Sequence, residues 1–336
     1  MLMRAIVYDA VGSVPRVADV PAPDCPPDGA VVEVRATGVC RSDWHAWRGH
    51  DPVPLPHIPG HEFAGVVSAV GPQVKGFAVG DRVTAPFVNG CGWCPYCVAG
   101  RAQICPNQTQ PGFTHPGSFA EQVQVRAADT NLVRLPDAVD FVPAAALGCR
   151  FATAFRALTG HGPVPDDAVV AVHGCGGVGL SAVMIAVALR LRVLALDLSP
   201  AATAMAASLG AVVVPSVVGE ADIAIDAYGS AETAEASVRS LRRGGRHVQV
   251  GLMLGDDARA PLPWDLVVAH ELQVVGSHGM AAVDYPPMLD LVARGRLDPG
   301  RLVGSVIDLA EAGEALRAMD SPIPAHAGIT VAVRSV

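Results

Sequence analysis

The pattern of apolar and polar positions changes near residue 150. Before that point, short alternating runs are separated by turn signals such as Gly71-Pro72 and Gly80-Asp81. Alternation over a few residues, bounded by such signals, is typical of half-buried strands. The pattern predicts an irregular antiparallel β-barrel over residues 1–150, with strands at 1–7, 30–36 and 62–70.

Residues 151–279 have a different texture, in which short apolar runs alternate with Ala-rich segments. Such alternation favours a parallel, doubly wound sheet with interleaved helices, so the predicted fold class is α/β plus β. Strands are expected at 168–173, 192–196, 211–214, 222–226, 246–250 and 271–276, and helices at 177–190, 200–209, 230–242 and 264–269.

The C-terminal part is expected to rejoin the first domain. Two helices are predicted at 284–294 and 308–319, and a β-rich run at 328–333 predicts a last strand. We therefore expect one domain from residues 1–150 with 280–336, and a second from residues 151–279.

A glycine-rich turn joins the first strand of the predicted parallel sheet to its first helix. Its glycines fit G-x-G-x-x-G, in which they allow a tight turn, approach of a pyrophosphate, and close packing of helix on strand. The next strand ends in Asp197, whose carboxylate can accept hydrogen bonds from ribose hydroxyls and would repel a 2′-phosphate. The sequence therefore predicts NAD rather than NADP, bound by Gly174, Gly176, Gly177, Val178, Gly179 and Asp197.

Composition excludes several classes of partner. The 336 residues carry a net charge of -8, and no Lys/Arg-rich run occurs, so neither nucleic acid nor an anionic membrane surface is expected as a partner. The N-terminus lacks a signal-peptide pattern, and no apolar run is long enough to span a membrane. We therefore expect a cytoplasmic protein whose cysteines stay reduced.

Four of the eight cysteines form one cluster, C-x2-C-x2-C-x7-C, at Cys91, Cys94, Cys97 and Cys105. Four thiolates bind Zn²⁺ tetrahedrally and leave no open position, which is typical of a structural site. Buried free thiols and an iron–sulfur cluster are the alternatives. The density of the cluster disfavours free thiols, and the spacing differs from the usual iron–sulfur patterns.

Further motifs carry a family resemblance. They are Cys40-Arg41-Ser42-Asp43-Trp44-His45, Gly60-His61-Glu62, Gly80-Asp81-Arg82-Val83 and Leu147-Gly148-Cys149. Together with the four-cysteine loop and the glycine turn, and in this order, they make the chain similar to the zinc-dependent medium-chain alcohol dehydrogenases over nearly its whole length. The resemblance implies a GroES-like barrel as the catalytic domain and a Rossmann domain that binds NAD.

The resemblance also implies a catalytic zinc held by Cys40, His61 and Cys149. As is known for alcohol dehydrogenases, two thiolates and one imidazole leave a fourth position open. Asp43 would accept the other ring N–H of His61 and so fix its tautomer. Glu62 would lie near the metal, where family members sometimes use it as an exchangeable ligand. With the four-cysteine site, two zinc ions per chain are expected.

Other roles are assigned by the same resemblance. The substrate proton would leave through the Ser42 hydroxyl, then the nicotinamide ribose, then His45 at the surface. Arg41 would pair with the pyrophosphate, while Ile329 occupies a position where some family members place a second cation. The nicotinamide would be flanked by Val250, Gly251, Ser277 and His278.

The substrate pocket is less defined by the sequence. By family analogy, it could be lined by Trp44, Trp47, His50, Phe87 and Arg150. Arg150 directly follows a proposed ligand, which suggests a substrate with an acidic or polar group as one hypothesis.

The leading functional hypothesis is reversible hydride transfer between NAD and a primary or secondary alcohol, the carbonyl partner being an aldehyde or ketone. A polyol or amino-cyclitol dehydrogenase, or a biosynthetic carbonyl reductase with the same zinc chemistry, is the alternative within the fold. Zinc-free quinone and enoyl reductases lack the three ligands. A non-catalytic NAD-binding protein is a remote alternative. A homodimer or homotetramer is expected, with the strand at 271–276 as a candidate for pairing across a two-fold axis.

Overall fold

The parallel sheet is present in the computed structural model, which describes residues 1–321 and 328–334. Its strands follow the order β10-β9-β8-β11-β12-β13, and every pairing is parallel. The strand order reverses at β8, which creates the crevice at the carboxyl ends of the strands where doubly wound sheets bind ligands. The strands are β8 (Val169–His173), β9 (Arg192–Leu196), β10 (Val212–Val213), β11 (Ala221–Asp226), β12 (Leu241–Gln249) and β13 (Gln273–Gly276).

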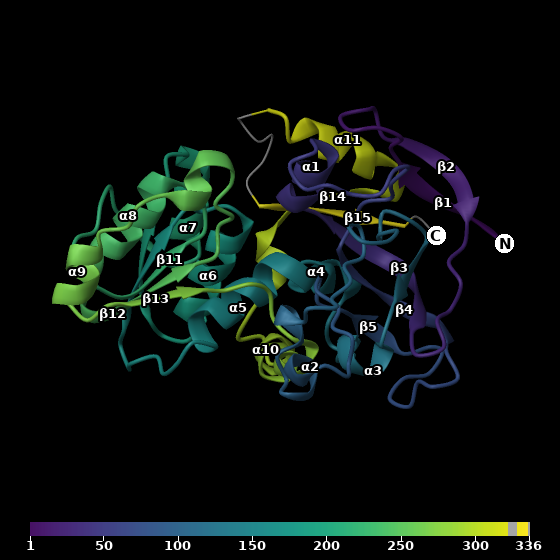
Figure 1. Ribbon diagram of the computed structural model, residues 1–336, viewed down its shortest axis with the longest axis horizontal. Coiled ribbons are helices and arrows are strands. Elements are labelled where there is room, and N and C mark those ends of the chain that lie inside the picture. Colours follow the sequence, from purple (N-terminus) through teal and green to yellow (C-terminus); the bar gives the residue numbers. More distant parts are fainter. Residues whose placement is uncertain (322–327, 335–336) are drawn as a thin grey trace. The chain divides into compact units, whose positions relative to one another are not determined.

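Helices cover this sheet (Figure 1). α6 (Gly177–Ala188) is buried from Gly179 to Ala186, as expected for a helix that is apolar on all sides. α7 (Pro200–Ser208) begins at an N-cap, Ser199, whose hydroxyl accepts a hydrogen bond from the Ala202 N–H at 3.4 Å. The others are α5 (Ala152–Thr159), α8 (Ala231–Arg239), α9 (Trp264–Ala269) and the 3₁₀ turn Gly255–Arg259.

The prediction of a helix over 230–242 was wrong at its C-terminal end. α8 stops at Arg239, and β12 begins at Leu241, before the strand expected at 246–250. The register against β11 shifts after the Ala221–Leu241 pair and resumes at Ile223–Arg246. Gly244 has φ +73°, a conformation that glycine adopts at little cost, so the segment bulges out of the ladder.

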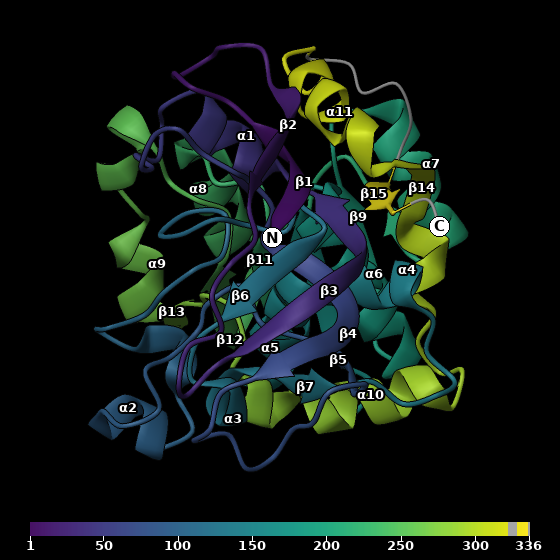
Figure 2. The ribbon, with the colours of Figure 1, turned by 90° about the vertical axis from the view of Figure 1, so that its right-hand side faces the viewer.

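The other sheet belongs to the barrel. β3 (Ala30–Val39) lies at its centre and pairs antiparallel with β4 (Glu62–Val70), β6 (Gln122–Val125) and β15 (Ile329–Val333) (Figure 2). β5 (Arg82–Thr84) and β7 (Val133–Arg134) extend the sheet beyond β4. β1 (Leu2–Val7) and β2 (Arg16–Pro21) form a separate antiparallel ribbon.

The barrel sheet is antiparallel except at one edge, which the C-terminal residues form. β14 (Val303–Asp308), which the sequence pattern did not reveal, pairs parallel with β15. A parallel pair needs a crossover connection. Here the connection includes the 3₁₀ turn Leu309–Glu311 and α11 (Ala312–Ala318), which replace the single helix expected at 308–319.

Short helices complete the barrel unit. They are α1 (Arg41–Trp47), α2 (Pro95–Val98), α3 (Ala128–Asn131), α4 (Phe141–Ala145), a π-helical turn (Leu147–Phe151), α10 (Tyr285–Ala293), and the 3₁₀ turns Ala102–Ile104, Ala282–Asp284 and Pro299–Leu302. The barrel core is formed by buried side chains of β3, β4, β5 and β6, among them Val34, Phe63, Val83 and Val123.

The chain divides into two compact units, Met1–Ala152 with Gly279–Val336, and Thr153–His278. Among the described residues, none of the helices has both the length and the apolar character needed to cross a bilayer.

Leu194 and Leu198 offer a matched test of the second unit's core. Leu194 is 3% exposed and packs in the sheet core, whereas Leu198 is fully exposed. Leu194→Ala should lower the free energy of unfolding of this unit by about 2–5 kcal/mol, because it leaves a cavity. Leu198→Ala should change it by no more than about 0.5 kcal/mol. Hydrogen exchange of the β8–β11 amides measures both values, and equal effects would contradict this packing.

Candidate active site

Four potential ligand atoms converge in the barrel unit. Cys40 follows the end of β3, His61 directly precedes β4, Glu62 begins β4, and Cys149 lies in the π-helical turn. One ligand atom from each residue lies within 4.8 Å of all the others. The fold therefore brings together residues that are far apart in the sequence.

Asp43 orients this cluster. Its Oδ1 accepts hydrogen bonds from His61 Nδ1 at 2.9 Å and from the Gly60 N–H at 3.0 Å, and its Oδ2 accepts from the Cys40 N–H at 3.1 Å. Because the Asp43 carboxylate is an acceptor, Nδ1 of His61 carries the proton and Nε2 has a free lone pair.

His61 Nε2 is buried and has no hydrogen-bond partner within the described residues. A buried polar atom of this kind is costly unless a ligand satisfies it. Two thiols and this imidazole nitrogen are the donors that Zn²⁺ prefers in a tetrahedral site with one open position. The residues present therefore fit a catalytic zinc ion.

The cluster strongly perturbs its own ionisation. A hydrogen bond from the Cys149 thiol holds the pKa of Cys40 well below its usual value, and the same bond raises the pKa of Cys149. Burial works to lower the pKa of His61, but the Asp43 carboxylate raises it well above the ordinary value.

Glu62 forms a buried ion pair with Arg150. Its Oε1 accepts hydrogen bonds from Arg150 Nε at 3.0 Å and from the Arg150 backbone N–H at 3.1 Å, while Oε2 pairs with Nη2. Glu62 is completely buried, and Arg150 is 8% exposed. The hypothesis that Arg150 meets an acidic substrate is therefore disfavoured, because its guanidinium already faces a carboxylate.

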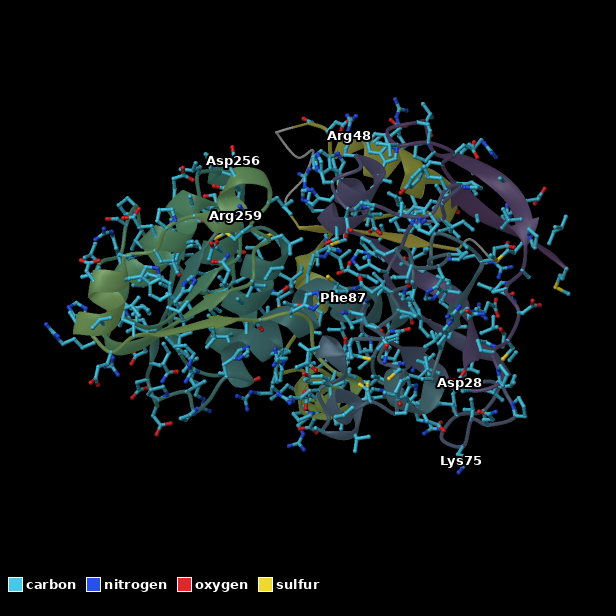
Figure 3. The ribbon with its side chains drawn as sticks, in the orientation of Figure 1. Asp28, Arg48, Lys75, Phe87, Asp256 and Arg259 are labelled. Carbon is cyan, nitrogen blue, oxygen red and sulfur yellow. The ribbon has the colours of Figure 1, made fainter. Side chains whose placement is uncertain are left out.

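Two aromatic rings contact the imidazole of His61. The ring of Phe87, which is labelled in Figure 3, lies 6.1 Å from it between centroids, and that of Phe113 lies 5.2 Å away. Both approach with their planes tilted by more than 60°. Phe87 is among the residues that the sequence predicts for the pocket, whereas Phe113 is not.

The proposed proton-relay residues lie on α1. The Ser42 hydroxyl oxygen is 3.8 Å from Cys40 Sγ. His45 Nδ1 lies 3.0 Å from Nδ1 of His50, so one ring donates and the other accepts. Burial lowers the pKa of His45, and the charges of His50 and Arg41 lower it further.

The remaining predicted residues of this helix are held by local contacts. The Arg41 guanidinium lies 4.8 Å above the ring centroid of Trp44 and donates to the Met319 carbonyl at 2.7 Å. Trp47 is 2% exposed, packs against Tyr8 and Leu316, and donates to the Ser13 carbonyl at 2.7 Å. Trp47 is thus a core residue, contrary to its proposed place in a substrate pocket.

The four-cysteine loop is arranged for a cation. The sulfur atoms of Cys91, Cys94, Cys97 and Cys105 lie within 4.8 Å of one another. Backbone N–H groups point at three of them, with Cys94 N 3.4 Å from Cys91 Sγ, Cys97 N 3.5 Å from Cys94 Sγ, and Cys91 N and Asn107 N 3.4 and 3.3 Å from Cys105 Sγ. Although burial raises the pKa of Cys91, N–H donors from Trp93 and Cys94 help to lower it to about 6. Such donors stabilise thiolates, as a zinc site requires.

The glycine turn after β8 has the geometry that its motif predicts. Gly174 has φ +90°, and a Cβ at Gly179 would lie 1.8 Å from the Gly174 carbonyl oxygen. A Cβ at Gly176 would meet nothing within 4 Å among the described atoms. The turn therefore leaves open space at Gly176, at the N-terminus of α6 with Gly177 and Val178, where a pyrophosphate can approach.

Asp197 lies at the end of β9 beside this turn. Its Oδ2 accepts a hydrogen bond from the Cys175 N–H at 2.6 Å, and Oδ1 accepts one from the Ser199 N–H at 2.7 Å. These bonds hold the carboxylate at the turn.

The expected nicotinamide contacts follow β12 and β13. The N–H groups of Val250 and Gly251 donate to the Asp226 carbonyl at 3.0 and 2.8 Å. Ser277 donates its N–H to Gln249 and accepts from Arg156 Nη1 at 3.3 Å, and His278 follows it directly. All four residues lie at the same edge of the parallel sheet as Gly174.

Comparison with known proteins decides the family. Residues 26–137 match the family model for the alcohol dehydrogenase GroES-like domain, and residues 177–294 match that for zinc-binding dehydrogenases. An alcohol dehydrogenase of Geobacillus stearothermophilus is 32% identical over 333 residues, which cover 95% of this chain and 96% of that protein. The chain belongs to the zinc-type medium-chain alcohol dehydrogenase family.

Solved structures agree with this family assignment. The alcohol dehydrogenase TADH from Thermus sp. ATN1 superposes with a TM-score of 0.89 at 31% identity, over 99% of this chain and 100% of that one. A protein of Sinorhizobium meliloti 1021, solved bound to NADP, gives a TM-score of 0.87 at 28% identity, over 99% of each chain. The predicted family, the GroES-like barrel and the Rossmann domain are confirmed, and the chain is an oxidoreductase of the alcohol dehydrogenase type.

Some contributors to the site of this alcohol dehydrogenase are not evident from its sequence. Phe113 carries no motif signal, and nothing in the sequence pairs Arg150 with Glu62. Gly38 does carry a sequence signal, because an isolated glycine inside a strand indicates that another group approaches the backbone closely there. A Cβ there would lie 2.3 Å from Glu62 Oε2.

Asp43→Asn tests the orientation of His61. The change should weaken metal binding at the Cys40 site by about 10–100-fold, because the residue no longer holds the imidazole with a charged acceptor. Competition with a chromophoric chelator measures the affinity. Asp129→Asn is the matched control, because Asp129 also accepts backbone N–H bonds, from Lys75 and Gly76, in the same unit. Equal metal affinity in both variants would contradict the role of Asp43.

Proposed function

We propose that the chain is an NAD-dependent zinc alcohol dehydrogenase, which transfers a hydride reversibly between NAD and a primary or secondary alcohol. The observation that carries this proposal is the buried, unpartnered Nε2 of His61 beside two thiols, in a chain of this family. A structural or NAD-sensing protein would have no use for a metal site with an open position.

Cys40, His61 and Cys149 would hold the catalytic ion, and Cys91, Cys94, Cys97 and Cys105 would hold a second, structural one. A zinc ion at the first site supplies Lewis-acid stabilisation of negative charge on the substrate oxygen. Asp43 keeps His61 in the tautomer that can act as a ligand.

The proton of the alcohol needs a route through the chain's own side chains. The Ser42 hydroxyl can both accept and donate a proton, as a relay requires. His45, partly exposed and paired with His50, can take up a proton and release it to solvent. Phe87 and Phe113 pack their rings against the imidazole of His61.

The second unit would bind NAD, the hydride acceptor, at the turn from Gly174 to Gly179 with Asp197 and the segments at Val250-Gly251 and Ser277-His278. The backbone of the turn takes the pyrophosphate, with Arg41 as a candidate cation. Asp197 favours NAD, since its carboxylate repels a 2′-phosphate. Because the similar protein of Sinorhizobium meliloti was solved with NADP, the preference for NAD needs a direct test.

We also expect a homo-oligomer located in the cytoplasm. A homodimer or homotetramer fits β13, which lies at the edge of its sheet in the described residues. A cytoplasmic location fits the reduced thiols that both zinc sites need.

A matched pair of glycine variants tests the cofactor turn. Gly176→Ala should leave stability unchanged, since the added Cβ meets open space, but should weaken NADH binding about tenfold or more because the methyl group blocks the pyrophosphate. Gly179→Ala should instead destabilise the unit, because its Cβ would strike the Gly174 carbonyl oxygen. Thermal unfolding and NADH fluorescence titration distinguish the two. If Gly176→Ala left NADH binding unchanged, the proposal that this turn binds the cofactor would be wrong.

The function is tested by metal content together with turnover. We expect two zinc ions per chain and NADH formation with simple aliphatic or aromatic alcohols, at higher kcat/KM with NAD than with NADP. Chelation should abolish turnover while NADH binding persists, because the metal and the cofactor use different residues.

A screen that includes polyols, amino-cyclitols and ketones separates the alternatives within the fold. Turnover confined to polyols would favour the polyol dehydrogenase. Higher efficiency with NADP would overturn the role of Asp197. A filled Cys40 site without turnover on any alcohol or carbonyl would favour the binding protein.

A further inference from the structure

The buried Arg150–Glu62 pair has no task in the reaction outlined above. Glu62 is one of four potential ligands whose donor atoms lie within 4.8 Å of one another, yet a catalytic site needs only three protein ligands. A carboxylate this close to the other three donor atoms could occupy the fourth position of a bound ion and exclude substrate. Something must therefore hold it away from the metal.

Arg150 makes contacts suited to this task. Among the described residues, it supplies all the hydrogen bonds that the Glu62 side chain accepts, using its backbone N–H, Nε and Nη2. The guanidinium reaches both carboxylate oxygens. This two-point contact fixes the plane of the carboxylate and also compensates its negative charge. The backbone N–H alone would leave Oε2 free.

The other side of the carboxylate is bounded by β3. Gly38 pairs with Glu62 across the β3–β4 ladder. A Cβ at Gly38 would lie 2.3 Å from Glu62 Oε2 and 3.1 Å from Arg150 Nη2. The space in which the ion pair lies therefore exists only because residue 38 has no side chain.

Electrostatics favours the same arrangement. A buried carboxylate beside two thiolates would be an uncompensated charge, and it could be relieved by protonation or by binding the cation. The Arg150 guanidinium neutralises it in place. Arg150 is itself one residue from Cys149, so any movement of this turn affects both.

We propose that Arg150 is a positioning residue that, with the space left by Gly38, holds the Glu62 carboxylate away from the catalytic metal and keeps the fourth coordination position open. This inference rests on the proposed function, since it requires a cation at Cys40, His61 and Cys149. It departs from the expectation that Glu62 serves as an exchangeable ligand.

The test uses the Co²⁺-substituted protein and imidazole as a neutral probe of the open position. A neutral probe is needed because loss of the arginine charge would weaken an anion by simple electrostatics. The four-cysteine site has no open position, so the difference spectrum on adding imidazole reports only the other site. In the wild-type protein, imidazole should shift the cobalt absorption bands.

Arg150→Met should weaken imidazole binding about tenfold or more, because the released carboxylate now competes for the metal. The cobalt spectrum without imidazole should change as well. Glu62→Gln/Arg150→Met should restore both, since the neutral amide is a poor ligand and the buried charge is gone. Arg82→Met is the matched control, because Arg82 is a partly buried arginine of the same unit that bonds to carbonyls away from the site.

Gly38→Ala gives a second test that alters no charge and does not depend on folding of Arg150→Met. Its methyl group should displace the carboxylate and change the cobalt spectrum in the same direction. Unchanged imidazole affinity in both Arg150→Met and Gly38→Ala would overturn the inference. So would a cobalt spectrum that changes in Glu62→Gln alone, because Glu62 would then be a ligand in the wild-type protein. A wild-type protein that binds Co²⁺ only at four thiolates would instead refute the proposed function and this inference with it.

Discussion

The active site depends on the hydrogen bonds that the Asp43 carboxylate accepts. They join the end of β3, the start of β4 and helix α1 at one buried point. Without this acceptor, the Cys40 and Gly60 N–H groups would be orphaned in the interior, and His61 could present either ring nitrogen. A single side chain thus serves folding and chemistry together, because the groups it satisfies are the ones that position the donor atoms.

Charge balance is the second constraint on this buried site. Two thiols, two carboxylates, an imidazole and a guanidinium share one buried space. Arg150 offsets the charge of Glu62, and Asp43 accepts the Nδ1 hydrogen bond of the imidazole. The remaining negative charge, on the sulfur atoms, is what a divalent cation would neutralise. In the four-cysteine loop, backbone N–H groups rather than charged side chains stabilise negative charge on the sulfur atoms.

Local signals made much of this predictable. The strand, turn and helix around Gly174 are defined by short-range steric rules, and they appear as expected. The cysteine spacing likewise placed four sulfur atoms together. Pairings between distant segments were not predictable, because no local pattern encodes them. Examples are the parallel β14–β15 pair, the bulge at Gly244 and the bond between Arg150 and Glu62. The prediction for Trp47 was wrong in the opposite way. This aromatic residue was expected in the substrate pocket because it lies near a proposed ligand in the sequence, but it packs in the core.

The position of β15 has a consequence for biosynthesis. This strand lies between β14 and β3, although more than 280 residues separate β15 from β3 along the chain. During translation, the nucleotide-binding unit can complete its sheet while the barrel sheet still lacks β15. Residues around Cys40, at the end of β3, must therefore wait for the synthesis of β15 before their side of the barrel closes. The nucleotide-binding unit can therefore finish folding during translation before the barrel unit does.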